Sequence, residues 1–373
     1  MPMSERQAEA LAIYNRVGNK TAVSREMGVN ESTARRLINK ALSWQEAEPG
    51  HVAAIEATGL DITQAKHGWR IVQHPDGSRD SVFWKRDEPE IAPQSLADAI
   101  KEALSDVEPA PKSVQKDSFT KNTCCVFPVA DLHMGLLTDF EEVGNDWDTK
   151  KAVAVFEKTF GALVARTPNA EVAVLAQLGD LTHNDDQRNV TPQSGHQLDV
   201  DSRYFMIVRR AVSVMKWAID SLRKKYPRVV YRGCRGNHDM TTHIAVTIAL
   251  SEHYRGCDDV EIIDSASEFY CHQYGKNMFV FHHGDRAKPE RLLPFVANEW
   301  PEMWGTTKHR VAFSGHVHHE WAKELAGMLF RSIGTIVPRD VHAFSNAYGS
   351  NRCLMSFTYD KLQGEVASAR VNL

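Results

Sequence analysis

Residues 228–239 read RVVYRGCRGNHD, a short apolar run that closes on a cluster of Gly, Asn, His and Asp. The same pattern recurs at CCVFPVADLH (124–133), EVAVLAQLGD (171–180), MFVFHHGD (278–285) and RVAFSGHVHH (310–319). Amphipathic segments over 149–166 and 203–226 separate the first three runs along the chain. Strands that alternate with helices predict an α/β fold with a layered sheet, in which polar residues gather at the strand ends.

The composition sets broad limits on the function. The chain has 373 residues, of which 42% are apolar and 25% charged, so it is not a mainly disordered or collagen-like protein. Its 44 basic and 48 acidic residues give a net charge of −4, and any nucleic-acid surface must therefore be local. The sequence shows no membrane span, signal peptide or C-x-x-C pair. We expect a cytoplasmic protein without a membrane partner.

The N-terminal region has the pattern of a small helical domain. Residues 20–43 predict a helix, a turn at Gly28 and a second helix with Ala34 and Ile38 on its apolar face. This arrangement resembles the helix-turn-helix family, whose second helix enters the major groove of DNA. A hairpin is expected over 66–86, which makes a winged variant an open possibility. The candidate nucleic-acid contacts in this region are Arg35, Arg36, Lys40 and Arg70.

We predict three parts along the chain. Residues 1–86 form the helix-turn-helix domain, and residues 119–373 form the α/β domain. Residues 87–118 hold eight acidic and three basic residues with several prolines, which is typical of an extended linker, here with one short helix.

Five of the predicted strand ends carry Asp, Asn or His, the residue types that can bind metals through nitrogen or oxygen. A single histidine is more often structural than metal-bound, but five such elements, each closing an apolar run, are hard to explain by chance. Burying so many carboxylates and imidazoles together is costly without a cation. Nitrogen and oxygen ligands without cysteine suit Mn, Fe, Zn, Ni or Co. The residues are Asp131, His133, Asp180, Asn237, His238, Asp239, His283, His316 and His318.

The ordered set D-x-H, G-D, G-N-H-D, H-G and G-H-x-H over 125–335 resembles the calcineurin-like metallophosphoesterase superfamily. The resemblance implies a two-sheet β-sandwich flanked by helices, in an α/β/β/α arrangement. It also implies two divalent metal ions, with Mn preferred and Fe, Zn, Ni, Co or Mg as alternatives.

The resemblance also assigns roles by position. One metal falls to Asp131, His133, Asp180 and His318, and the other to Asp180, Asn237, His283 and His316, so that Asp180 bridges the two. His238 is expected to face the substrate phosphate and to protonate the leaving oxygen, oriented by Asp239.

The segment after Asp180 contains further candidates. The run from Gly179 to His183 is similar to the G-D-L-x-H run of SbcD-type break-repair nucleases, so His183 is a candidate nucleic-acid contact. A second-shell or surface histidine is the alternative. The polar stretch that follows is either a substrate-side loop or a solvated surface loop, and its candidate residues are Asp185, Asp186, Arg188, His196 and Arg203.

A helix-turn-helix joined to a calcineurin-like domain is similar to the layout of phage and prophage proteins. We predict a metal-dependent phosphodiesterase, a DNA nuclease targeted by its N-terminal domain, in the host cytoplasm if phage-encoded. One alternative is a nucleotide or protein phosphatase or phosphodiesterase whose N-terminal domain contacts protein. Another is a DNA-binding regulator with an inactive phosphoesterase domain, which the complete set of motif residues disfavours. Whether the chain forms a homodimer stays open.

Overall fold

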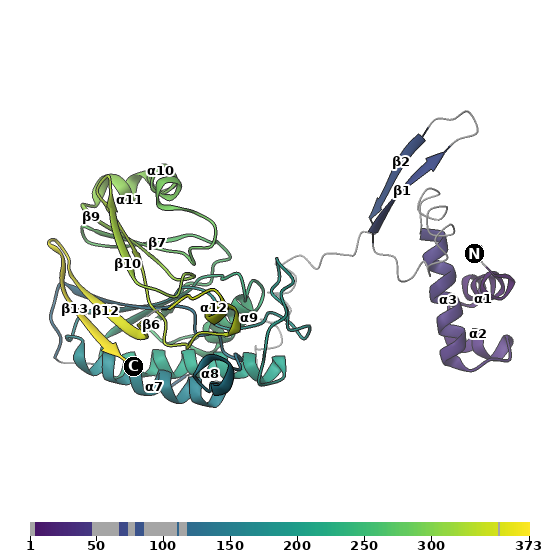
Figure 1. The fold of residues 1–373 in the computed structure, drawn as a ribbon, viewed down its shortest axis with the longest axis horizontal. Coiled ribbons are helices and arrows are strands. Elements are labelled where there is room, and N and C mark those ends of the chain that lie inside the picture. Colours follow the sequence, from purple (N-terminus) through teal and green to yellow (C-terminus); the bar gives the residue numbers. More distant parts are fainter. Residues whose placement is uncertain (1–3, 47–66, 74–78, 86–109, 112–117, 350) are drawn as a thin grey trace. The chain divides into compact units, whose positions relative to one another are not determined.

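The computed structural model describes residues 4–46, 67–73, 79–85, 110–111, 118–349 and 351–373 (Figure 1). The chain divides into two compact units, Met1–Ile91 and Ala92–Leu373. The short helix expected inside the 87–118 linker lies outside the described residues. Ala110 and Pro111 of that predicted linker are hydrogen-bonded to helices of the larger unit: the Ala110 N–H donates to the His253 carbonyl at 2.6 Å, and Arg223 donates to the Pro111 carbonyl at 2.9 Å.

The described residues of the smaller unit form three helices and a hairpin. Its elements are α1 (Glu5–Val17), α2 (Lys20–Glu26), α3 (Glu31–Glu46), β1 (His67–Gln73) and β2 (Arg79–Lys85), with β1 and β2 antiparallel. The Ser4 hydroxyl accepts the Gln7 N–H, and the Gln7 side chain accepts the Ser4 N–H, so α1 begins with a capping box. Gly28 takes a φ of +65° between α2 and α3, a conformation that glycine adopts at little cost. The helices pack around Ala10, Ile13, Val23, Ala34 and Ile38.

The larger unit is built on two sheets, which confirms the predicted α/β class. The six-stranded sheet has the order β13-β12-β3-β4-β5-β6, with β3 to β6 parallel and β12 antiparallel to both of its neighbours. Its strands are β3 (Thr123–Val129), β4 (Val172–Gln177), β5 (Arg228–Gly233), β6 (Val260–Ile262), β12 (Cys353–Asp360) and β13 (Gly364–Asn372).

The five-stranded sheet has the order β10-β11-β9-β8-β7. Strands β8, β9 and β11 are parallel, while β7 and β10 run antiparallel at the two edges. Its strands are β7 (Tyr270–Tyr274), β8 (Asn277–Phe281), β9 (His309–Ser314), β10 (Trp321–Leu325) and β11 (Met328–Ser332).

Helices cover the outer face of each sheet. In Figure 1, α7 and α8 run along the six-stranded sheet, while α10 and α11 lie on the other side of the unit, beside the five-stranded sheet. In the part of this unit that the structure describes, the helices are α6 (Phe140–Val143), α7 (Thr149–Arg166), α8 (Tyr204–Arg223), α9 (Thr242–His253), α10 (Pro289–Glu299), α11 (Pro301–Thr306) and α12 (Val341–Ser345). Among the described residues, no helix combines the length and the apolar character that crossing a bilayer requires.

Side-chain alternation along β3 shows how the layers are held together. Phe127 belongs to the cluster shared with α7 and α8, whereas Val126 belongs to the cluster between the two sheets, with Phe281 and Phe313. Because successive residues point to opposite faces, a strand covered on both faces is apolar throughout. All seven residues of β3 are buried. A third cluster, which includes Val280 and Leu292, packs α10 onto the five-stranded sheet.

Candidate metal centre

The motif residues follow the carboxyl ends of five strands. Asp131 and His133 come after β3, Asp180 after β4, and Asn237 after β5, which are adjacent parallel strands of one sheet. In the other sheet, His283 follows β8, and His316 and His318 follow the adjacent parallel strand β9. Carboxyl ends of neighbouring parallel strands share an edge, so each sheet gathers its own set of candidate ligands.

The backbone at these positions is strained. Nine non-glycine residues have positive φ among the described residues, and five of them are predicted ligands. L-residues rarely adopt this left-handed conformation, which costs about 1–3 kcal/mol each and persists only where the surrounding structure enforces it. The five are Asp131 (53°), His133 (40°), Asp180 (50°), His316 (69°) and His318 (57°).

The glycines of the motifs allow the strand ends to approach one another. A Cβ on Gly236 would overlap the backbone nitrogen and carboxylate of Asp180, and a Cβ on Gly315 would lie 2.6 Å from Asp131 Oδ2. A Cβ on Gly179 would lie 2.9 Å from the Cα of Gly236. These glycines are therefore required for close contact, and their presence next to each ligand has a steric explanation.

The first cluster consists of Asp131, His133 and His318. The Nε2 atoms of His133 and His318 lie 3.1 Å apart, and His318 Nε2 lies 3.7 Å from Asp131 Oδ1. One donor atom from each of the three residues falls within 4.8 Å of the others, which is close enough to hold one metal ion. The carboxylate of Asp131 also accepts the His316 N–H at 3.0 Å, which ties the ends of β3 and β9 together.

The second cluster consists of Asp180, His283 and His316, whose donor atoms also lie within 4.8 Å of one another. His283 Nε2 lies 3.2 Å from Asp180 Oδ2 and 2.9 Å from Asn237 Oδ1. Asp180 Oδ2 is also 3.9 Å from His133 Nε2, so this carboxylate is within reach of both clusters. His283 Nδ1 donates to the Leu178 carbonyl at 2.8 Å, which leaves Nε2 facing the cluster.

The charges of the site fit a divalent metal. Asp131 and Asp239 are fully buried and Asp180 is 2% exposed. Burial raises the pKa of Asp131 to about 8, and burial with the Asp180 charge raises the pKa of Asp239 to about 7. Burial lowers the pKa of His133, and that of His318 to about 4, so these imidazoles are neutral, the form that binds metals. A divalent cation would compensate the concentrated carboxylate charge.

His283 is the exception among the candidate ligands. Burial opposes its positive charge, but the carboxylates of Asp180 and Asp131 outweigh burial and raise its pKa to about 10. In turn, His283 holds the pKa of Asp180 well below its usual value despite burial. The two carboxylates thus favour positive charge at this place.

Asp239 was expected to orient His238, but in the structure its carboxylate has backbone amides as partners. Its carboxylate accepts the backbone N–H groups of Asp180, Leu181 and Gly236, at 3.2, 2.8 and 2.8 Å, and so fixes the backbone around the site. The His238 ring is oriented instead by the His183 carbonyl, which accepts its Nδ1–H at 2.7 Å. Its Nε2 is thereby left as the ring atom available to a substrate. The His238 N–H donates to Asp180 Oδ1 at 2.8 Å.

His183 lines the pocket but is almost fully buried. The side chain is 2% exposed, and its Nδ1 lies 3.1 Å from Nδ1 of His133. This contact leaves Nε2 of His133 toward the first cluster, so that the His183 ring contacts a candidate ligand. His183 therefore supports both His133, through its ring, and His238, through its carbonyl.

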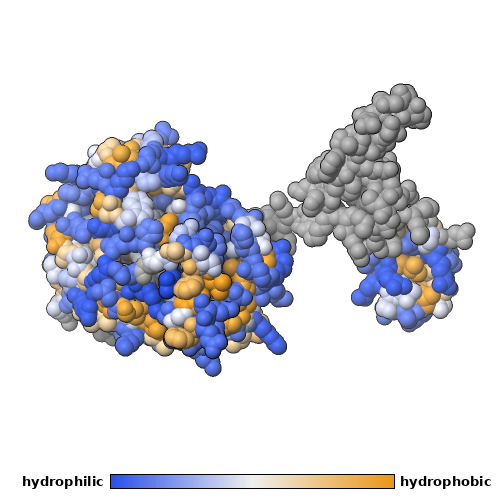
Figure 2. Space-filling model, viewed as in Figure 1, coloured by the Kyte–Doolittle hydropathy of each residue, from blue (hydrophilic) through white to orange (hydrophobic). Residues whose placement is uncertain are grey.

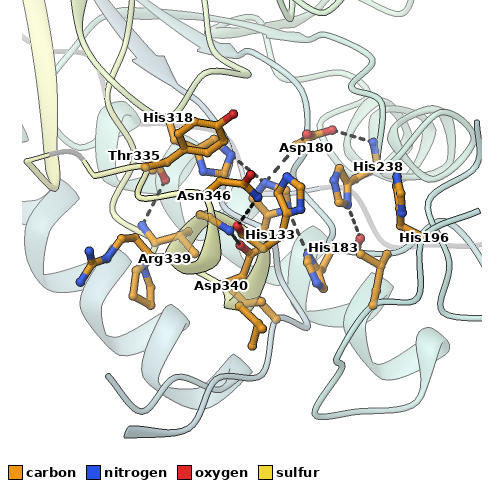
Figure 3. Close-up of a pocket in the computed structure, with 18 of the residues that line it drawn as sticks. His133, Asp180, His183, His196, His238, His318, Thr335, Arg339, Asp340 and Asn346 are labelled. Atoms are coloured by element: carbon orange, nitrogen blue, oxygen red, sulfur yellow. Dashed lines mark hydrogen bonds and ion pairs between the residues drawn. The ribbon is translucent and has the colours of Figure 1, made fainter. Parts of the chain in front are cut away.

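Both clusters lie at a pocket of about 1190 Å³, lined on one side by residues of 191–199 and on the other by residues of 335–349. Figure 3 shows the imidazoles of His133 and His318 close to Asp180, with Arg339, Asp340 and Asn346 along the α12 side. Sequence reasoning missed this second wall, because it carries no spacing motif. It also missed Thr335, whose buried hydroxyl donates to the Asp131 carbonyl at 2.7 Å.

The remaining nucleic-acid and substrate-side candidates of the sequence lie in different parts of the structure. Arg35 and Arg36 are exposed on α3, whereas the side chains of Lys40 and Arg70 lie outside the described residues. His196 lines the pocket, as the substrate-side prediction requires. Asp185 has a structural role instead: it accepts the Thr241 and Thr242 N–H groups and thereby caps α9.

No protein-family model matches the sequence, and no curated protein matches it in sequence. Solved structures of low similarity include a predicted phosphoesterase from Streptococcus pneumoniae TIGR4 (13% identity, 67% of this chain and 98% of that one, TM-score 0.29). An archaeal phosphodiesterase has 11% identity, and the match covers 67% of this chain and 99% of that one with a TM-score of 0.31. Vps29 of Entamoeba histolytica, complexed with Zn²⁺, has 12% identity, and the match covers 66% of this chain and 98% of that one with a TM-score of 0.25. The function proposed below rests on the geometry of the site.

Proposed function

We propose that the chain is a phosphodiesterase that depends on two divalent metal ions, Mn²⁺ by preference, and that cleaves DNA. The observation that carries the proposal is the pair of His/Asp clusters with Asp180 within reach of both, at one large pocket. Asp131, His133, Asp180 and His318 would hold one ion, and Asp180, Asn237, His283 and His316 the other. When bound, the two ions would clamp the phosphoryl oxygens and supply the nucleophile at neutral pH.

The chain's own residues orient the reacting groups. His238 is half-buried at the pocket, and its Nδ1–H is committed to the His183 carbonyl. Nε2 is therefore the ring nitrogen left for the substrate, and when the ring is protonated on both nitrogens, Nε2–H can give its proton to a leaving oxygen, which is the task of a general acid. Asp239 and the motif glycines hold the backbone of Asp180 and Gly236 in place, so that the ligands are preorganised before substrate binds.

The smaller unit supports the choice of DNA. Helix α3 follows the Gly28 turn and presents the guanidinium groups of Arg35 and Arg36 to solvent. We propose that α3 contacts phosphates and brings the substrate to the catalytic unit. Each phosphate contact then contributes about 0.9 to the slope of log affinity against log salt concentration.

The test combines an activity panel with a charge-removal variant. The full-length protein, stripped of metal and reloaded with Mn²⁺, Mg²⁺, Ni²⁺ or Zn²⁺, is assayed on single-stranded DNA, duplex DNA, RNA and bis(4-nitrophenyl) phosphate. Arg35→Ala/Arg36→Ala is compared with Lys150→Ala/Lys158→Ala, which removes two exposed charges from α7. We expect only the first pair to lower the salt slope for DNA, by up to about 2, without changing turnover of the small diester.

The outcomes test the phosphodiesterase activity, the two-metal centre and the targeting role of α3 separately. Metal-dependent hydrolysis of the small diester without DNA cleavage would leave a phosphodiesterase that acts on another substrate. Full activity in a chelator would refute the two-metal centre. Equal salt slopes for both double variants would remove the targeting role of α3.

A further inference from the structure

Exposed apolar side chains gather at the pocket mouth. Four of the large apolar residues that are exposed among the described residues line the pocket: Leu137, Val317, Val341 and Tyr348, at 43%, 42%, 41% and 62% exposure. Figure 2 shows the visible face of the larger unit as a mixture in which apolar residues, in orange, break a largely hydrophilic surface. Single exposed apolar residues need no explanation, but a group around one opening marks a binding surface.

An aromatic ring and a cation stand on the α12 wall. Tyr348 follows α12 and lines the pocket, and its N–H donates to the Ala343 carbonyl at 2.9 Å, which anchors its backbone to the helix. Arg339 also lines the pocket, and its guanidinium carbon lies 5.0 Å from the centre of the Phe344 ring, which is outside the pocket lining. This wall therefore combines the flat apolar face of Tyr348 with an exposed cation, a pairing suited to bases and phosphates.

The candidate ligands differ in exposure, and the pocket has room for a large substrate. Asp131 and His133 are at most 4% exposed, whereas the His318 side chain is 35% exposed and lines the pocket. The pocket volume of about 1190 Å³ also exceeds the roughly 300–1,000 Å³ typical of small-molecule sites. There is thus room for nucleotides on either side of the reacting phosphate.

We propose that the α12 wall is a base-stacking subsite for single-stranded nucleic acid, in which Tyr348 stacks on a base next to the reacting phosphate and Arg339 contacts a neighbouring phosphate. This inference rests on the proposed phosphodiesterase function and specifies the substrate of that site. Base faces are accessible in a single strand but covered by their neighbours in a duplex, so the subsite selects unpaired ends or loops.

The experiment uses the full-length protein with Mn²⁺ and three substrates: a short oligothymidylate, its duplex with oligoadenylate, and bis(4-nitrophenyl) phosphate. Tyr348→Ala is compared with Tyr348→Phe, which keeps the ring, and with Leu362→Ala, a 67% exposed residue in the β12–β13 turn. We expect Tyr348→Ala to raise KM for the single strand about 5- to 150-fold, which corresponds to about 1–3 kcal/mol per stacked base. Tyr348→Phe and Leu362→Ala should match the wild type.

The possible results test the base-stacking subsite separately from the proposed phosphodiesterase function. A selective loss on the single strand, with the small diester unaffected, supports the subsite. Cleavage of oligothymidylate that is equal in Tyr348→Ala and Leu362→Ala refutes the subsite and leaves the nuclease intact. Faster cleavage of the duplex than of the single strand also refutes it. If the wild type hydrolyses only the small diester, the nucleic-acid subsite is wrong, and if it hydrolyses nothing, the proposed function fails as well.

Discussion

Gly236→Ala tests whether close packing of the strand ends builds the metal centre. The added Cβ would overlap two atoms of Asp180, its backbone nitrogen and its Oδ1. Neither atom is free to move, because the Asp180 N–H donates to Asp239 and Oδ1 accepts the His238 N–H. The collision therefore has to be relieved by shifting the backbone of one strand end against the other.

The expected cost follows from this geometry. Overpacking of a rigid interior costs about 1–3 kcal/mol, which corresponds to a Tm about 2–12 °C lower in a unit of this size. Because Asp180 is within reach of both clusters, its displacement should weaken Mn²⁺ binding at both. We expect at least a tenfold weaker affinity, of the order seen when outer-shell support is lost.

A matched glycine provides the control. Gly161 lies inside α7, where an added Cβ would meet only the Trp217 ring, at an ordinary 3.8 Å. Gly161→Ala should raise stability by about 0.5–1 kcal/mol, since alanine is the better helix residue, and leave metal binding unchanged. Thermal unfolding in a chelator and calorimetric titration with Mn²⁺ measure both quantities. If Gly236→Ala keeps the wild-type Tm, stoichiometry and affinity, the steric explanation of this motif glycine is wrong.

Three further expectations follow from single side chains. His238→Ala should keep its bound metal and lose about 10²- to 10⁴-fold in turnover, less for good leaving groups, and loss of metal instead would make His238 a ligand. His183→Ala removes the ring against Nδ1 of His133 and should weaken Mn²⁺ binding about 10- to 100-fold; an unchanged titration would contradict its supporting role. Burial lowers the pKa of His243 from 6.5 to about 4. Between these two pH values the unfolded chain binds a proton that the folded chain does not. The free energy of unfolding therefore falls by about 3 kcal/mol as the pH drops from 6.5 to about 4. His243→Leu should flatten the fall in Tm between pH 7 and 4.5, and an unchanged slope would exclude His243 as its cause.

Local sequence patterns predicted much of the larger unit. The segment 149–166 coincides with α7 (Thr149–Arg166), because its apolar stripe and its N-terminal cap at Asp148 are both local features. The apolar runs become strands, and their polar ends carry the candidate ligands. That these ends approach one another follows from parallel pairing, since β3, β4 and β5 are adjacent and point the same way.

Side-chain partners inside the site were less predictable. Asp239 follows His238 directly in the sequence, yet its carboxylate accepts the backbone amides of Asp180 and Leu181, which follow the neighbouring strand β4. His183 was a candidate surface contact, yet its ring packs against His133, 50 residues earlier. Such partners depend on how the strand ends cross in space, which spacing along the chain does not specify.

The sequence by itself determined the chemistry available at the centre: which histidines, carboxylates and glycines end the strands, and in what order. The family resemblance assigned these residues to two clusters, and tertiary structure alone decided what closes the pocket above them. Asp131 meets the His316 N–H, 185 residues away, only because the two sheets pack face to face around residues such as Phe281 and Phe313. The α12 wall has no motif and reaches the pocket only through the path of the chain after β11. Local propensity and periodicity act over a few residues, whereas these contacts form only when the whole sandwich has packed.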